Sequence, residues 1–238
     1  MIQGYRKLKD MPVNLLLEGL PNKVRNRILQ QSDVVDLEFG DVLCEQDQPY
    51  RHIYFPLSSS LSLIINIGHH PPLEMGMIGN EGMLGVKLVL GFNIAQLRSE
   101  VLGPGTALRI AAPQFRRELR ENIFLRRSLN RYLHVLIAQL SRIAACTHFH
   151  EVESRLARWL LMAHDRAHTD HIYFTHQTLA NMLGVQRSAI TIAAGILQQR
   201  GYIRYIRGDI RVLDRAGLEA ASCDCYSVLI GNYDQLFI

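Results

Sequence analysis

The sequence of 238 residues contains few cysteines and no long uninterrupted apolar run. Cys44, Cys146, Cys223 and Cys225 are too few and too scattered for a disulfide scaffold, so we expect four reduced, buried thiols. No apolar stretch approaches the length of a membrane span, and the first 20 residues lack the apolar core of a secretion signal. These absences favour a cytoplasmic protein with no membrane partner.

The sequence also lacks the residue arrangements of enzymes and cofactor sites. No Ser, Cys or Lys stands in a nucleophile arrangement, and an iron–sulfur cluster would need about four suitably spaced thiolates, of which none precedes Cys44. The His148 and His150 pair is typical of solvated surface. The Cys223 and Cys225 pair could be a redox or metal pair, but a buried terminal helix explains it as well. We predict no catalytic residues, no metal and no cofactor.

Positive charge is carried almost entirely by arginine. Of the 26 basic residues 22 are Arg, and the segment from Arg116 to Arg215 holds 16 Arg and no Lys against eight acidic residues. Arginine binds phosphate and guanine through two hydrogen bonds, so this basic segment favours a nucleic-acid partner. Arg-rich helices also occur without any ligand, and the charge alone therefore only supports a motif found by other means.

The clearest motif lies between Thr175 and Tyr202. Two steeply crossed helices need a small residue at closest approach and a bend that tolerates positive φ, and Ala180 and Gly184 supply these. Apolar residues spaced at i, i+3, i+4 and i+7 give each helix one buried stripe, and Thr175 is placed to cap the first helix. The spacing predicts a helix-turn-helix whose second helix spans about 186–199.

The second helix should present a polar face to solvent. Its expected outward residues are Gln186, Arg187, Ser188, Thr191 and Ile192. These side chains suit base edges and phosphates in a DNA major groove. After Gly201, two strand-like runs joined at Gly208 and Asp209 predict a basic hairpin containing Arg207, which suits a phosphate-gripping wing. Helical hairpins of this kind also occur without DNA, and a protein partner is the alternative for the same surface.

Residues 34–112 have a different sequence pattern, in which short apolar or alternating runs are separated by Gly, Pro and Asn. This pattern predicts an antiparallel β-roll, jelly-roll-like, preceded by two short helices, and we assign 1–112 to one domain. Such rolls also hold metal-dependent oxygenase sites built from two His and a carboxylate. His69 and His70 are followed by two prolines, which makes their segment a turn, so we predict a protein that is not an enzyme.

No Gly or Pro interrupts the helical pattern that fills 113–147, which we assign as a long dimerisation helix. Its predicted seam consists of Leu125, Leu129, Tyr132, Leu136 and Ile143. A stripe of this kind can pack against its own copy, and a two-fold dimer would suit paired DNA half-sites. The alternative is a monomer whose stripe is covered by the roll. Residues 148–238 are assigned to a winged helix-turn-helix domain, closed by a terminal helix that covers it.

This order of elements, the Gly-acid turn at Gly40 and Asp41 and the motif over 174–203 resemble the Crp/Fnr family of bacterial transcription regulators over nearly the whole chain. The resemblance implies an α+β homodimer that binds double-stranded DNA, with RNA polymerase as a further partner. By position it gives the guanine contact to Arg187 and two further base contacts to Ser188 and Ile192. It gives phosphate contacts to Thr175, His176 and Gln177.

The family's cyclic-nucleotide pocket is incomplete in this sequence. The resemblance implies a carboxylate on the ribose and an Arg-Ser-Ala turn on the cyclic phosphate, and the nearest candidates are Glu81, Arg98 and Ser99. Asn80 splits the Gly-Glu pair, and Glu100 stands where the turn has Ala and would repel a phosphate. We expect no binding of cyclic AMP or cyclic GMP, and a roll that senses another signal or only supports the dimer.

Overall fold

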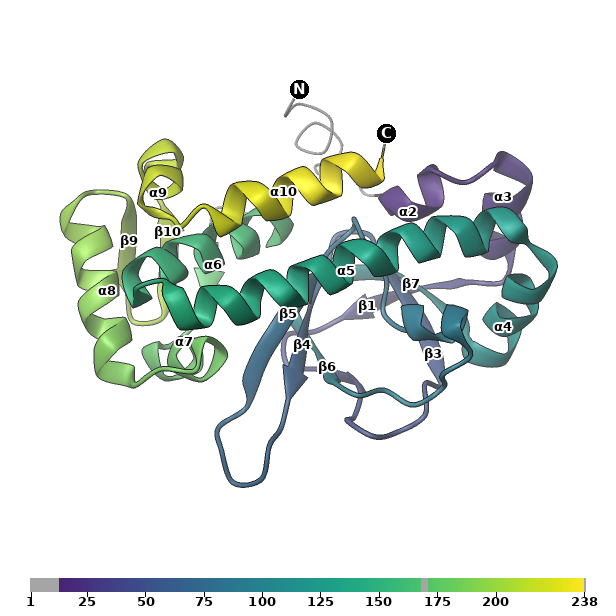
Figure 1. The fold of residues 1–238 in the computed structure, drawn as a ribbon, viewed down its shortest axis with the longest axis horizontal. Coiled ribbons are helices and arrows are strands. Elements are labelled where there is room, and N and C mark those ends of the chain that lie inside the picture. Colours follow the sequence, from purple (N-terminus) through teal and green to yellow (C-terminus); the bar gives the residue numbers. More distant parts are fainter. Residues whose placement is uncertain (1–12, 168–170, 238) are drawn as a thin grey trace.

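The computed structural model describes residues 13–167 and 171–237. A β-roll lies beside one long helix, and a helical region with a small sheet follows at the far end of that helix (Figure 1). The predicted α+β architecture is confirmed. The first residues of the chain, on which the expectation about a secretion signal depends, lie outside the described part. Among the described helices none has the length and apolarity needed to cross a membrane.

Two antiparallel sheets form the roll. The first contains β1 (Asp33–Leu37), β7 (Gly105–Ala111) and β3 (His52–Pro56), and the second β2 (Val42–Cys44), β6 (Arg98–Gly103), β4 (Ser60–Ile65) and β5 (Leu73–Ile78), each in that spatial order. Buried apolar side chains from both sheets, such as Phe55 and Leu61, form the core between them. The helices α2 (Leu15–Glu18) and α3 (Asn22–Gln30) precede the roll, and the 3-10 helix η1 (Val86–Leu90) lies between β5 and β6.

The helical stretch after the roll is divided in two. α4 (Ala112–Glu121) and α5 (Ile123–Phe149) meet at Asn122, whose backbone is extended. The Asn122 side-chain oxygen accepts hydrogen bonds from the backbone N–H groups of Phe124 and Leu125 at 3.1 and 3.2 Å. This is an N-cap, so α5 begins ten residues later than the uninterrupted pattern predicts.

Beyond α5 the chain forms the C-terminal region. Its elements are α6 (Val152–Ala167), β8 (His171–Tyr173), α7 (His176–Leu183), α8 (Arg187–Gln199), β9 (Ile203–Ile206), β10 (Asp209–Val212), α9 (Arg215–Ala221) and α10 (Cys225–Leu236). The single terminal helix that we predicted is therefore two helices.

Of these two helices, α9 packs on α6 of the DNA-binding region, where the terminal helix was predicted to lie, whereas α10 turns back along α5 toward the roll (Figure 1). The Tyr233 hydroxyl donates to Gln139 Oε1 at 2.6 Å, and the Arg131 guanidinium donates to the Gln235 carbonyl at 3.0 Å. These bonds and the buried apolar side chains of α10 fasten it to α5.

Two buried carboxylates of the roll hold α6. Glu81 accepts from the Nε and Nη2 groups of Arg166 at 2.9 and 2.6 Å, and both side chains are almost fully buried. Glu74, on β5, accepts from Trp159 Nε1 and from the Ser62 hydroxyl, each at 2.7 Å. Since a buried charge is costly without its partner, these contacts fix the C-terminal region on the roll.

Burial raises the pKa of Glu74 from 4.5 to about 7, although the bonds from Ser62 and Trp159 oppose the shift. The Glu74 carboxyl therefore binds its proton more tightly in the folded protein than in the unfolded chain. The resulting stabilisation, about 3 kcal/mol, is full below about pH 4.5 and is lost as pH rises through about 7.

We expect Glu74→Gln to lose less stability than the wild type between about pH 5 and pH 8, because glutamine has no charge to bury. Ser62 can turn its hydroxyl to accept from the new amide. Thermal unfolding across this pH range measures the difference, with Glu38→Gln, at an exposed carboxylate of the same roll, as control. Parallel loss of stability in the wild type and Glu74→Gln would contradict the assignment.

Candidate nucleic-acid interface

The predicted helix-turn-helix is formed by α7 and α8. Gly184 ends α7 with φ 62° and Ala180 is fully buried where the helices cross, as the spacing predicted. The Thr175 hydroxyl caps α7 by accepting from the Thr178 N–H at 3.1 Å. The buried Arg155 of α6 donates to the carbonyl of Leu183, at the end of α7. The start of α7 is therefore fixed by its cap, and its end, where the turn begins, is fixed by α6.

The second helix of the motif exposes the predicted face. Its exposed residues include Gln186, Arg187, Ser188, Thr191 and Ile192. Ile192 is 66% exposed, so its side chain is accessible to a partner. The Thr191 hydroxyl is already engaged, because it lies 3.0 Å from His176 Nδ1 and donates to the Arg187 carbonyl at 3.1 Å.

His176 joins three elements at the base of this face. Its ring lies 4.5 Å from that of Tyr205 on β9, and its Nδ1 faces Thr191 on α8. Partial burial, together with the positive charge of Arg187, lowers the pKa of His176. The ring is therefore neutral near pH 7 and would not form an ion pair with a phosphate.

The predicted wing is a hairpin of β9 and β10. Its turn consists of Arg207 and Gly208, both with positive φ (50° and 93°), one residue earlier than the sequence predicted. The wing is fixed to α8 because Gln198 Oε1 accepts from the Tyr205 N–H at 2.7 Å. A third strand, β8, pairs with β10 and was not predicted. Arg207 stands exposed at the tip.

Comparison with known proteins agrees with this geometry. Residues 154–221 match the Crp-like helix-turn-helix domain family. A Crp/Fnr-family transcriptional regulator from Eubacterium rectale is 18% identical, with 87% of this chain and 96% of that chain covered and a TM-score of 0.67. FixK2 from Bradyrhizobium japonicum is 11% identical, with 81% and 98% covered and a TM-score of 0.67. No curated protein matches the sequence.

The chain is a DNA-binding transcription regulator with the Crp/Fnr fold. Crp/Fnr regulators bind DNA and typically act as dimers, and they are not enzymes. The two alternatives raised by the sequence, a metal-dependent β-roll enzyme and a protein-binding module, find no support in these comparisons.

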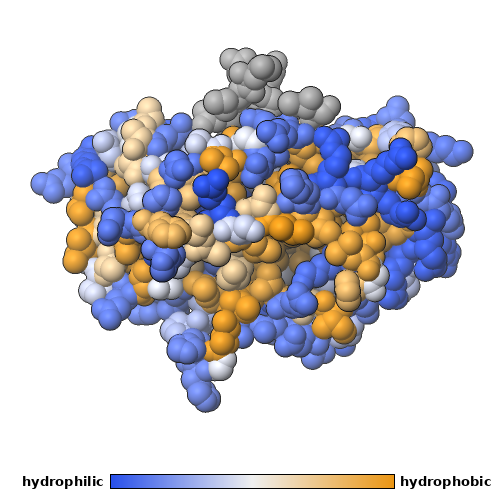
Figure 2. Space-filling view, viewed as in Figure 1, coloured by the Kyte–Doolittle hydropathy of each residue, from blue (hydrophilic) through white to orange (hydrophobic). Residues whose placement is uncertain are grey.

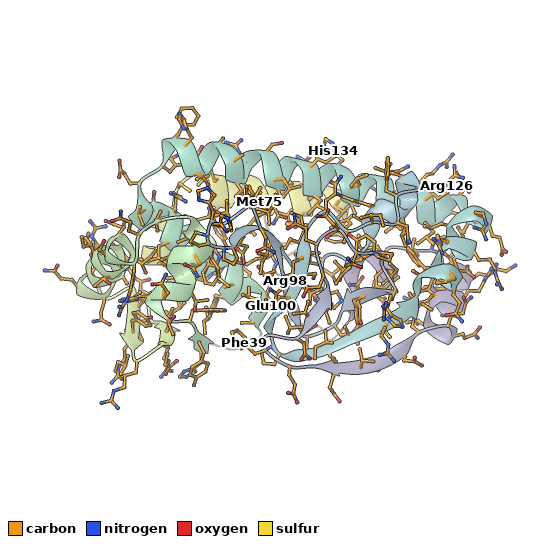
Figure 3. All side chains as sticks on the ribbon, turned by 90° about the horizontal axis from the view of Figure 1, so that it is seen from below. Phe39, Met75, Arg98, Glu100, Arg126 and His134 are labelled. Atoms are coloured by element: carbon orange, nitrogen blue, oxygen red, sulfur yellow. The ribbon has the colours of Figure 1, made fainter. Side chains whose placement is uncertain are left out.

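The regulator does not bring its predicted nucleotide-binding residues together. Glu81 is buried against Arg166, whereas Arg98 lies on β6 and pairs with Glu100 at 3.1 Å and with Glu45 at 3.7 Å. Arg98 and Glu100 lie next to one another in Figure 3. Ser99, between them in sequence, is fully buried. Both charges that would recognise a cyclic nucleotide are thus neutralised by the protein, and the absence of such binding stays a prediction.

A different cavity lies between the roll and α5. It has a volume of about 210 Å³, and apolar side chains such as Leu63, Met83 and Leu136 dominate its lining. Among the described residues that line it, Lys87 is the one with a charged side chain, and burial lowers the pKa of this amine. An effector that fills this cavity would be small and mostly apolar.

The predicted dimer seam lies inside the regulator. Leu125, Leu129, Tyr132 and Leu136 are at most 7% exposed, and Ile143 is half-buried. The apolar stripe packs on the chain's own core, which was the alternative that the sequence left open, because α5 needs this face to cover the roll. These four buried side chains are therefore not available for the predicted seam, and a second copy would have to use another stripe of α5.

Three of the cysteines, expected to be scattered, converge with His150. The donor atoms of Cys146, His150, Cys223 and Cys225 all lie within 4.8 Å of one another. The hydrogen bond from the Cys223 thiol and the charge of Arg158 lower the pKa of Cys146, although burial opposes this. The same bond raises the pKa of Cys223. Sequence spacing could not reveal this group, because Cys146 and Cys223 stand 77 residues apart.

We expect Arg187→Ala to weaken binding to the preferred DNA site by about 1–3 kcal/mol and to relax the preference at one base pair in each half-site, because the guanidinium can donate two hydrogen bonds to guanine. Gel shifts on the preferred site and on single-base variants measure this. Arg207→Ala should weaken all these sites alike, and Arg120→Ala, at an exposed arginine of α4, is the matched control. An equal loss on every sequence with Arg187→Ala would make it a phosphate contact.

Proposed function

We propose that this regulator binds DNA as a homodimer, with one α8 from each protomer in the major groove of each half-site. The exposed face of α8, with Arg187 in its first turn, is the observation that carries the proposal. A recognition helix presents the residues of its first turns to base edges in the groove, and Arg187 is the first residue of α8. DNA as the ligand in turn favours a cytoplasmic location in a bacterial cell.

The proposed contacts divide into base and phosphate contacts. Arg187 would bind guanine, Ser188 would bind a base edge, and Ile192 would pack on a thymine methyl. Thr175, His176 and Gln177 lie at the beginning of α7, where free backbone N–H groups attract phosphate.

Two further exposed side chains complete the proposed surface. Gln186, the residue before α8, would contact the DNA backbone beside the base that Arg187 binds. Arg207 at the wing tip would bind a phosphate across the groove. The hydroxyl of Thr191 would hold His176 in place and approach the DNA with its methyl group.

The proposed dimer seam is a stripe of α5 beside its buried face, on which Ile137 and Ala144 are exposed and Leu133 and Leu140 are half-buried. In chain order these residues are spaced four, three and four residues apart. Ile137 is 55% exposed in the single chain, and apolar surface runs along α5 in Figure 2. A two-fold axis across this stripe would bury the same residues twice, which is the usual arrangement of paired helices.

The roll would act on this dimer as a sensor or as a support. The cavity between the roll and α5 is the proposed effector site, because a ligand there would contact both α5 and the roll. RNA polymerase is the proposed further partner, as the resemblance to the Crp/Fnr family implies.

Selection of bound duplexes from a random pool tests the function. We expect two inverted half-sites whose centres lie about one helical turn apart, because a two-fold dimer repeats its contacts. Recovery of no common sequence would contradict sequence-specific binding. A single half-site without its inverted copy would contradict the dimer.

We expect Ile137→Glu to remain folded and become monomeric, because the new charge would face its own copy across the seam. The adjacent Leu136→Glu should unfold the protein, since Leu136 is 7% exposed and packs in the core. Light scattering gives the oligomeric state and circular dichroism the folding. The monomer should also lose most of its DNA affinity because the half-sites are no longer linked. A dimeric Ile137→Glu protein would place the seam elsewhere.

A further inference from the structure

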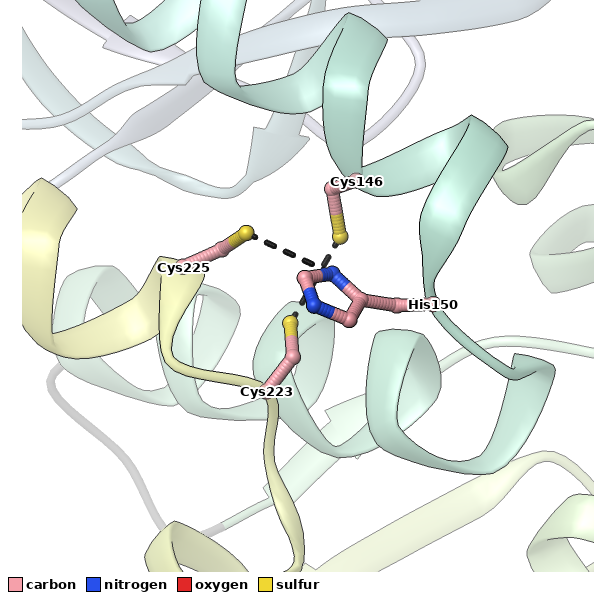
Figure 4. A group of neighbouring side chains, drawn as sticks. All are labelled: Cys146, His150, Cys223 and Cys225. Atoms are coloured by element: carbon pink, nitrogen blue, oxygen red, sulfur yellow. Dashed lines mark hydrogen bonds between the residues drawn. The ribbon is translucent and has the colours of Figure 1, made fainter.

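The converging cysteines and histidine come from two places in the chain. Cys146 lies in the last turn of α5 and His150 directly follows that helix. Cys223 and Cys225 lie at the junction between α9 and α10 (Figure 4). The Sγ atoms of Cys146 and Cys223 are 3.5 Å apart, and Cys225 Sγ is 3.6 Å from His150 Nδ1. Four donors thus face one small volume.

We propose that Cys146, His150, Cys223 and Cys225 bind a single zinc ion. Zinc takes four ligands in a tetrahedron, with sulfur at about 2.3 Å and nitrogen at about 2.0–2.1 Å, so neighbouring donors lie about 3.6–3.8 Å apart. The sulfur–nitrogen separation of 3.6 Å equals the lower of these edges, the sulfur–sulfur separation of 3.5 Å is slightly shorter than the upper one, and all the donors fall within 4.8 Å. Three thiolates and one imidazole are a common ligand set of structural zinc.

The surroundings of the group also suit a bound ion. His150 Nε2 lies 3.3 Å from Asp224 Oδ1, so the ring can donate there while its Nδ1 faces the cysteines. A carboxylate that orients a ligating histidine is typical of metal sites. The three sulfur atoms belong to residues that are at most 7% exposed. The buried Arg155 and Arg158 interact electrostatically with Cys146, and their charge offsets that of three thiolates around one zinc.

Two other uses of these cysteines fit the geometry less well. An iron–sulfur cluster needs its thiolates spread around several irons, whereas donors within 4.8 Å of one another surround one ion. A disulfide between Cys146 and Cys223 would use two of the four side chains. It would leave the His150 and Asp224 pair and the Cys225 thiol without a role.

The site lies where a bound ion would join two separate parts of the DNA-binding region. Cys146 and His150 mark the point where α5 passes into the DNA-binding region, and the α9–α10 junction follows the wing. One ion would therefore tie the chain before the helix-turn-helix to the chain after it, close to the end of α5. On the proposed function, which this step assumes, zinc holds the reading helices at a fixed angle to the dimer seam.

Metal analysis of the full chain, purified with a reductant, tests the site directly. We expect about one zinc per chain by mass spectrometry of the metal content. After chelation, titration with Co²⁺ should give the thiolate-to-cobalt and tetrahedral cobalt absorption bands, saturating at one ion per chain. Absence of these bands, or a disulfide between Cys146 and Cys223 in the reduced preparation, would overturn the proposal.

Variants identify the ligands. Cys223→Ser and His150→Ala should lose the bound ion, and Asp224→Asn should weaken zinc binding about 10- to 100-fold. Cys44→Ser is the matched control, because Cys44 is a buried thiol on β2 of the roll, outside the group. The wild-type cobalt spectrum decides the proposal even where a variant does not fold. Full retention of zinc by Cys223→Ser would overturn the ligand set.

A DNA-binding measurement separates this site from the proposed function. We expect chelation to weaken DNA binding by the wild type and by Cys44→Ser, and zinc to restore it. Equal DNA affinity with and without zinc would overturn the coupling. A zinc-loaded protein that binds no DNA would overturn the proposed function and leave the metal site standing.

Discussion

The arrangement of this regulator depends on the buried ion pair between Glu81 and Arg166. Glu81 follows the last strand of the hairpin formed by β4 and β5, and Arg166 lies near the end of α6, so one pair of charges joins the roll to the DNA-binding region. Its removal from water is compensated only while both partners are present, since either charge left alone would be costly to bury. The bond from Trp159 to Glu74 secures the same helix two turns earlier.

Because α6 is fixed to the roll in this way, the helices that pack on α6 are also fixed relative to the roll. Arg155 of α6 binds the end of α7, α8 packs against α6, and Gln198 of α8 fixes the wing. Glu81 is the nearest candidate for the ribose-binding carboxylate that the family resemblance implies. Here it bonds to an arginine of the same chain and so joins two parts of the fold.

The sequence predicted those parts whose pattern is local. The roll followed from short runs between turn residues, and the helix-turn-helix from Ala180 and Gly184, whose roles depend on contacts only a few residues away. The Asn122 cap was missed because a search for Gly and Pro ignores asparagine as a helix start. The dimer seam failed for a related reason. Periodicity shows that α5 has an apolar stripe, but not whether the roll or a partner covers it.

The long-range parts could not be derived from spacing. α10 lies along α5 through bonds such as Tyr233 to Gln139, 94 residues apart, and this return of the chain is what carries the α9–α10 junction to the end of α5. A pair of cysteines two residues apart means little by itself. It becomes a candidate site only when the fold sets it opposite Cys146 and His150, and the fold does so because α10 buries its apolar face on the helix from which Cys146 comes.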